Sequence, residues 1–328
     1  MTRKTPLARW ALTSVLAMLP MLPLSSAAQT PYPSRPITLI VPFAPGGIAD
    51  LTARAVAEHM AKTLGQAVVV DNRPSAGAIV ATGWVAKAAP DGYTLLLMSN
   101  SNALSATLFK KLPFDVQRDF APISTLGFFD IGLFVVGHAK WSTLPELLIA
   151  AKQAPGKLTV GTIAVGSTQH LAAEYFKSAT GVDLLRVPYK GTPAVQTALR
   201  AGEVDLAFEI VGPMLAQVAS GDIKVLAVSS DKRNPALPKT PTVSEVSVTG
   251  YNLASWNALA APAGTPAEVV DKLNRAARDA VASPAVQERL TKLGMRLQSS
   301  TPLQMGALLS SEVKRWGEVI RAARIEPE

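Results

Sequence analysis

One stretch of this sequence decides its fold: Ile37-Thr-Leu-Ile-Val-Pro-Phe-Ala-Pro-Gly-Gly-Ile-Ala-Asp50. Residues 37–41 are apolar on both faces, as strands are in a parallel sheet that helices cover on both sides. Pro45 fixes the entry to a turn, while Gly46 and Gly47 lack the Cβ atoms that would keep a ligand away from the backbone. A helix starting here would aim its free N–H groups and the positive end of its dipole at an anion. The alternative is an ordinary strand-to-helix turn whose glycines only satisfy sterics.

The same alternation of apolar runs and helical periods continues along the chain and predicts βαβ units in a mostly parallel sheet. The predicted strands are residues 37–41, 67–70, 94–98, 133–136, 158–161, 184–187, 206–208 and 225–228. The predicted helices are residues 50–64, 144–153, 167–180 and 193–201, with a helix-rich C-terminal part after Pro266. The chain is expected to cross between two lobes in two segments that lie between apolar elements, residues 127–132 and 233–255. We therefore expect lobe 1 to contain residues 30–129 and 253–328, lobe 2 to contain residues 130–252, and a ligand cleft between them.

Composition excludes several classes of protein. The 328 residues include no cysteine, so disulfides, thiolate metal sites and thiol nucleophiles are excluded. The net charge of +8 includes Arg3, Lys4 and Arg9 near the N-terminus, and the other basic residues are scattered along helices rather than clustered with aromatics, which argues against nucleic-acid binding. The three histidines have no metal-ligand spacing, and no nucleophile with a base or cofactor loop is evident. We expect no metal, no cofactor and no catalytic residue.

The first 28 residues have the pattern of a signal peptide. Arg3, Lys4 and Arg9 precede an apolar run that contains Pro20 and ends near small residues suited to signal peptidase. The run is shorter than the roughly 20 residues that a membrane-spanning helix needs. We therefore predict that the chain is exported to the periplasm and is free there. Separately, we expect a monomer.

A second possible anion site follows the predicted strand at residues 158–161, in the sequence Val160-Gly-Thr-Ile-Ala-Val-Gly-Ser-Thr-Gln-His170. Gly166 would leave N–H groups open there, and the alternative is that Ser167 simply caps the helix. His170 is expected to face the cleft or pack on the helix rather than act as a base. Glu209, at a strand end, would either meet a ligand donor or be a solvated loop acid.

Two further strand ends carry polar groups. Ser99-Asn-Ser-Asn102 would donate to a carboxylate or form an Asx turn. Lys190, after Tyr189, would point into the cleft or into water, and long lysines more often do the latter.

Taken together, these segments resemble the substrate-binding receptors of tripartite tricarboxylate transporters, also called Bug receptors. The resemblance covers nearly the whole chain after the signal peptide. It rests on Pro42-Phe-Ala-Pro-Gly-Gly-Ile-Ala-Asp50, Asp71-Asn-Arg-Pro74, Ala88-Ala-Pro-Asp-Gly-Tyr-Thr-Leu95, Gly166-Ser-Thr-Gln-His-Leu171, Val187-Pro-Tyr-Lys-Gly191, Gly202-Glu-Val-Asp-Leu206, Leu237-Pro-Lys-Thr-Pro-Thr242 and Ala261-Pro-Ala-Gly-Thr-Pro266.

The resemblance implies a type II periplasmic-binding-protein fold, in which two α/β lobes joined by two crossing strands close on a small organic carboxylate. It implies transfer of that ligand to the membrane permease subunits of a tripartite tricarboxylate transporter. A sensor that feeds a signalling system, or less plausibly an exported enzyme, is the alternative. The ligand-binding residues expected by position are Phe43, Ala44, Pro45, Gly46, Gly47, Asp50, Ala76, Ser99, Asn100, Asn102, Thr162, Gly166, Ser167, Thr168, His170, Tyr189 and Glu209.

The chain departs from the family pattern at three places near this set. Ser75-Ala-Gly-Ala78 replaces a glycine-rich run, Ile163-Ala164 replaces a small residue and a glycine, and Glu209 stands where an aspartate is frequent. Added Cβ atoms would narrow the pocket, so the identity of the ligand should not be taken from any relative.

Overall fold

The computed structural model describes residues 1–2, 31–322 and 325–326, and Tyr32–Glu328 forms one compact unit. The predicted signal peptide, residues 1–28, lies outside the described part of the chain apart from its first two residues. Within the described residues, no helix combines the length and the apolar character needed to cross a membrane.

The first half of the sheet is built around β1 (Ile37–Val41). It pairs in parallel with β2 (Val68–Asn72) and β3 (Thr94–Ser99), and β9 (Ala254–Pro262) then runs antiparallel to β3. β1 is almost entirely buried, as its sequence, apolar except for Thr38, predicts. A buried Leu, Ile or Val side chain stabilises a fold by about 1.5–3 kcal/mol, so these central strands contribute strongly to stability.

One long strand, β4 (Phe120–Val136), belongs to both halves of the sheet. Its first part pairs with β9 and with β10 (Met295–Leu297), whereas from Ile131 onward it pairs with β7 (Leu206–Ile210) and β8 (Ile223–Val228). β5 (Thr159–Ile163) and β6 (Leu185–Tyr189) complete the second half in parallel. The predicted crossing at residues 127–132 lies inside β4, where the partners change. The exact lobe boundaries stay a prediction.

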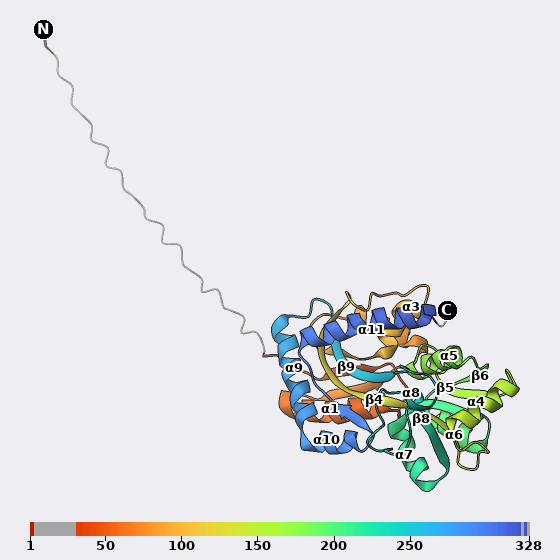
Figure 1. The fold of residues 1–328 in the computed structure, drawn as a ribbon. Helices are drawn as coiled ribbons and strands as arrows, with labels where there is room; N and C mark the ends of the chain where they lie inside the picture. Colours follow the sequence, from red (N-terminus) through yellow and green to blue (C-terminus); the bar gives the residue numbers. More distant parts are fainter. Residues whose placement is uncertain (3–30, 323–324, 327–328) are drawn as a thin grey trace. The chain divides into compact units, whose positions relative to one another are not determined.

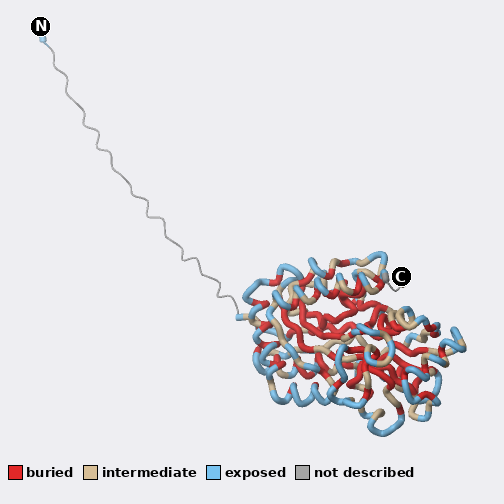
Figure 2. The backbone as a smooth tube through the Cα atoms, in the orientation of Figure 1, coloured by how far each residue is buried: buried red, intermediate tan, exposed pale blue. Residues whose placement is uncertain are grey.

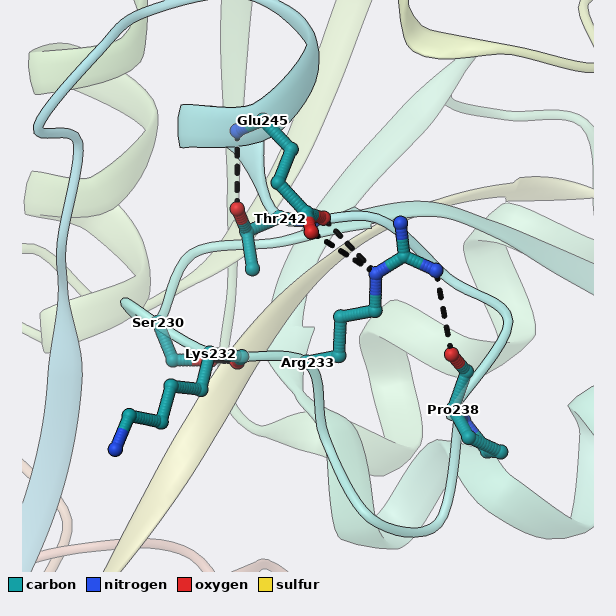
Figure 3. Close-up of polar contacts among 6 residues, drawn as sticks. All are labelled: Ser230, Lys232, Arg233, Pro238, Thr242 and Glu245. Carbon is teal, nitrogen blue, oxygen red and sulfur yellow. Dashed lines mark hydrogen bonds and ion pairs between the residues drawn. The ribbon is translucent and has the colours of Figure 1, made fainter.

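The chain returns to the first half through the segment between β8 and β9, which is mostly a loop rather than a crossing strand. Its short helix α8 (Val243–Val246) begins at a capping box, in which Thr242 Oγ1 accepts from the Glu245 N–H and Glu245 accepts from the Thr242 N–H. Arg233 Nε lies 3.0 and 3.1 Å from the two Glu245 oxygens, and the Arg233 guanidinium also donates to the Pro238 carbonyl (Figure 3). These bonds give the return segment a defined path.

Helices flank both halves of the sheet. α1 (Ile48–Leu64), α9 (Ala267–Ala282) and α10 (Pro284–Thr291) group beside the first half, whereas α4 (Leu144–Gln153), α5 (Thr168–Thr180) and α6 (Thr192–Ala201) lie around the second (Figure 1). Buried residues concentrate in the strands and in the inner faces of these helices (Figure 2). The predicted helices are present, and the C-terminal part is helical through α11 (Pro302–Ala322).

Sequence patterns missed several elements for identifiable reasons. The predicted strand at residues 133–136 is only the end of β4, because Pro122, Gly127 and Asp130 interrupt the apolar run before it. β9 was missed because polar residues alternate within it. No prediction was made for α2 (Ile79–Ala86), which follows the 3₁₀ turn η1 (Ala76–Ala78), for α3 (Asn100–Leu108), or for α7 (Val211–Ser220).

Candidate ligand site

A cavity lies where the two halves of the sheet meet. The part of the cavity that the centres of water molecules can occupy has a volume of about 60 Å³. One water needs roughly 10–15 Å³ of such volume. The cavity can therefore hold a small solute. The lining residues come from both halves: Pro42, Phe43, Ala44, Gly47, Ile48, Ala49, Pro74, Ser75, Ser99, Ser101, Phe129, Ile163, Ala164, Thr168, Gln169, Lys190, Gly191, Thr192, Ile210, Ser255 and Asn257.

Five helices begin at this cavity. α1, α3, α5, α6 and α7 each place a lining residue in the first turn or at the N-cap: Gly47, Ile48 and Ala49; Ser99 and Ser101; Thr168 and Gln169; Gly191 and Thr192; Ile210. The first N–H groups of a helix have no partner inside the helix, and its dipole places about half a positive charge there. The lining residues include Lys190 but no aspartate or glutamate. The cavity is therefore electropositive and suited to an anion.

The β1–α1 turn is held in shape from behind. Gly46 has φ +83° and donates its N–H to Asp50 Oδ2 at 3.0 Å, while Asp50 Oδ1 lies 2.9 Å from Arg54 Nε. Arg54 also donates to Asn72, whose amide donates to the Phe43 carbonyl. Asp50 therefore shapes the turn, which leaves the N–H groups at the start of α1 to face the cavity.

The β5–α5 turn is capped by its own side chains. Ser167 Oγ accepts from the His170 N–H at 3.1 Å, and His170 Nδ1 accepts from the Gly166 N–H at 3.1 Å. Burial, followed by the charges of Arg186 and Lys177, lowers the pKa of His170 to about 3. His170 is thus a neutral, buried capping residue, and the cavity wall is formed by the next residues, Thr168 and Gln169.

Glu209 lies fully buried behind this wall, which contradicts the alternative of a solvated loop acid. Its Oε1 accepts from Gln169 Nε2 at 2.6 Å and from the Ile210 N–H at 2.8 Å. Burial raises the pKa of Glu209 to about 7, and hydrogen bonds from Gln169, Ile210 and Thr192 limit the rise.

The two walls touch across the cavity mouth. The Gly77 N–H donates to the Val165 carbonyl at 2.7 Å, and the Thr168 and Ser255 hydroxyls lie 3.2 Å apart. A Cβ added to Gly166 would lie 2.6 Å from Gly77 Cα, and one added to Gly191 would lie 3.0 Å from Ala44 Cβ. Glycine at these positions therefore permits the close approach of the walls.

The structure brings some of the predicted site residues to the cavity and places others elsewhere. Phe43, Ala44, Gly47, Ser99 and Thr168 line it. The other predicted residues are not among those lining the cavity. The exposed ones are Pro45, Gly46 and Ala76, and the buried capping or bridging ones are Asp50, Asn100, Asn102, Ser167 and His170. The remaining ones, beside or behind the second wall, are Thr162, Gly166, Tyr189 and Glu209. Ligand contact by any of them stays a prediction.

Several lining residues were missed. Gln169 lies in the first turn of the predicted helix 167–180, and Thr192 immediately precedes the predicted helix 193–201, so both stand next to helix starts that the sequence had identified. Ser255 and Asn257 lie two residues apart on β9, and this spacing places both side chains on the same face of a strand. Lys190, to which we gave little weight, lines the cavity although much of its side chain is exposed.

Comparisons with known proteins point to one family. Residues 52–325 match the family described as the tripartite tricarboxylate transporter family receptor. Solved structures similar to this chain include the periplasmic binding protein BugD (35% identity, TM-score 0.87), which is matched over 90% of this chain and 100% of its own. Two others come from Rhodopseudomonas palustris. Rpa4515 with adipate is 34% identical (TM-score 0.87, 90% and 100% covered), and MatC with bound malate is 32% identical (TM-score 0.84, 88% and 100% covered).

Proposed function

Because this chain belongs to the tripartite tricarboxylate transporter receptor family, we propose that it captures a small organic carboxylate in the periplasm and delivers it to the membrane permease of such a transporter. The family is one of periplasmic solute-binding receptors, so the chain is a receptor and not an enzyme. One observation carries the carboxylate assignment: five helix starts surround a cavity whose lining residues include no acid. The adipate and malate bound by two similar structures support it.

A ligand screen by thermal shift tests this proposal. A ligand that binds only the folded protein raises its stability by mass action, by about 2.7 kcal/mol at a hundred times its Kd. We expect at least one member of a panel of dicarboxylates, hydroxy acids, acidic amino acids and aromatic acids to raise the melting temperature. The matching amides should not. A panel in which no acid stabilises the protein would contradict the carboxylate assignment.

The variant Gly47→Val tests whether the start of α1 holds the carboxylate. Gly47 has ordinary backbone angles, and a Cβ there would meet Thr192 Oγ1 at 3.5 Å, so the valine methyl groups would enter the cavity without straining the fold. We expect about tenfold weaker binding of the screened acid by calorimetry, which corresponds to about 1.4 kcal/mol. An unchanged melting temperature without ligand would show that the fold is intact. Unchanged affinity would count against this wall as the binding surface.

Export is the second part of the proposal, and it rests on the sequence of residues 1–28. We expect protein recovered from the periplasm to begin at or near Gln29, because signal peptidase cleaves after small residues such as Ala28. Mass spectrometry of the N-terminal peptide measures this directly. Recovery of the intact Met1 terminus in a membrane fraction would contradict release into the periplasm.

A further inference from the structure

We infer that Gln169 selects carboxylates that also carry a hydrogen-bond donor, a hydroxyl or an ammonium group, and that Glu209 is the positioning residue that makes Gln169 do so. This inference rests on the proposed function and narrows the class of ligand. It concerns the second wall of the cavity, where Gln169 lies in the first turn of α5 and Glu209 lies directly behind it.

The hydrogen bonds of Glu209 fix which end of the Gln169 amide faces the cavity. Glu209 Oε1 accepts the Ile210 N–H, so this oxygen acts as an acceptor and the Gln169 group beside it must be the NH₂. The carbonyl oxygen Oε1 and the second N–H of the amide are then what Gln169 has left to offer. None of the described residues donates to that oxygen, and Gln169 lines the cavity. This part of the wall therefore presents an acceptor.

Asn257 adds a second acceptor to the same cavity from β9. Its Nδ2 donates to the Trp256 carbonyl at 3.2 Å, and its Oδ1 is buried with no hydrogen-bond partner among the described residues. Asn257 is 1% exposed and lines the cavity. A buried acceptor without a donor is unfavourable, so Asn257 Oδ1, together with the acceptor that Gln169 presents, favours a ligand that brings donors of its own.

The cavity thus has two kinds of polar surface. The helix starts supply N–H donors that match a carboxylate, whereas Gln169 and Asn257 supply acceptors. A plain diacid offers only acceptors when ionised and would leave these oxygens unpaired. A hydroxy acid or an amino acid can satisfy both surfaces. Sites built to bond a substrate hydroxyl discriminate strongly against the analogue that lacks it.

Matched ligand pairs test this selection by calorimetry at pH 8, where Glu209, with a pKa of about 7, is ionised. The pairs are succinate and malate, glutarate and 2-hydroxyglutarate, and phenylacetate and mandelate, with aspartate to separate an ammonium from a hydroxyl donor. For whichever pair binds, we expect the hydroxy acid to bind at least tenfold more tightly than its plain partner. Affinities within twofold of each other would overturn the inference while leaving carboxylate binding intact. If no probe binds, the proposed function falls, and the inference falls with it.

Two variants separate selection from a structural role. In Gln169→Met the acceptor is lost at similar side-chain volume, so the affinity ratio within the pair should fall to about one. In Glu209→Met the acceptor that holds the Gln169 NH₂ is lost, so Gln169 can turn either end of its amide to the cavity, and the ratio should fall while the plain acid gains affinity. A merely structural change would weaken both ligands equally, and that outcome would refute the role of Glu209. Gln196→Met is the matched control, because Gln196 donates to the Pro213 carbonyl and does not line the cavity; its ratio should equal that of the unmodified protein.

Discussion

Replacing Gly166 by alanine should weaken ligand binding by about a hundredfold. Gly166 has φ +76°, and a Cβ there would lie 2.6 Å from Gly77 Cα and 3.1 Å from Gly77 N. Because these are backbone atoms, no change of rotamer can relieve the overlap. The Gly77 N–H donates to the Val165 carbonyl beside this contact, so the added methyl group would hold the two walls apart and break that bond. A hundredfold loss corresponds to about 2.7 kcal/mol, which a lost hydrogen bond and incomplete closure together can supply.

Gly181→Ala is the matched control for this variant. Gly181 ends the same helix, α5, with φ +69°, and no heavy atom lies within 4 Å of a Cβ added there. Both alanines carry the strain of the left-handed conformation, about 1 kcal/mol, but only the one at Gly166 meets the opposite wall. Calorimetry with the screened acid should therefore show a loss of affinity in Gly166→Ala alone. Equal affinities in the two variants would show that closure does not depend on this contact.

The two strand-to-helix turns could be predicted because their signals are local. Pro45 stands beside Gly46 and Gly47 in the first turn, and Gly166 stands beside the capping residue Ser167 in the second. The structure places lining residues of the cavity in both turns or directly after them. The hydrogen-bond network by which Asp50 holds the β1–α1 turn could be predicted from the sequence only in part. Its ion pair with Arg54 follows the helical i, i+4 spacing, whereas the link from Asn72 to the Phe43 carbonyl spans 29 residues. Long-range hydrogen bonds of this kind have no signature in a single sequence.

The parts of the site that sequence missed depend on strand pairing. Asn257 reaches the cavity because β9 pairs with both β3 and β4, and Phe129 reaches it from the middle of β4. Glu209 was expected at a strand end, and a charged residue there normally faces solvent. The structure buries it because Gln169 and the Ile210 N–H satisfy one of its oxygens. Burial of a charge through partners distant in sequence is a tertiary effect.

His170 and Glu209 should give the protein an unusual dependence of stability on pH. The folded pKa of His170, about 3, lies below its ordinary value of 6.5, so the unfolded chain binds the extra proton between these values. The free energy of unfolding therefore falls as the pH drops below about 6.5, by up to about 1.4 kcal/mol per pH unit. Glu209 has the opposite sign. Its folded pKa of about 7 exceeds its ordinary 4.5, so its contribution is fully present below pH 4.5 and is lost as the pH rises through 7.

Between about pH 4.5 and 6.5 the effects of His170 and Glu209 on the pH dependence of the free energy of unfolding should cancel. A variant that lacks one of the two groups should therefore show the pH dependence that the other group causes. We expect His170→Asn, whose Oδ1 can still accept the Gly166 N–H, to lose stability steadily with rising pH across this window, relative to the unmodified protein. Glu209→Gln should instead lose stability with falling pH. Urea unfolding at pH 4.5, 5.5, 6.5 and 7.5 measures the difference between each variant and the unmodified protein, which removes the contribution of the other carboxylates. Curves that run parallel for all three proteins would show that neither group titrates differently in the folded state. Slopes of opposite sign would instead establish that the wall behind the cavity holds a neutral histidine and a carboxyl group poised near neutral pH.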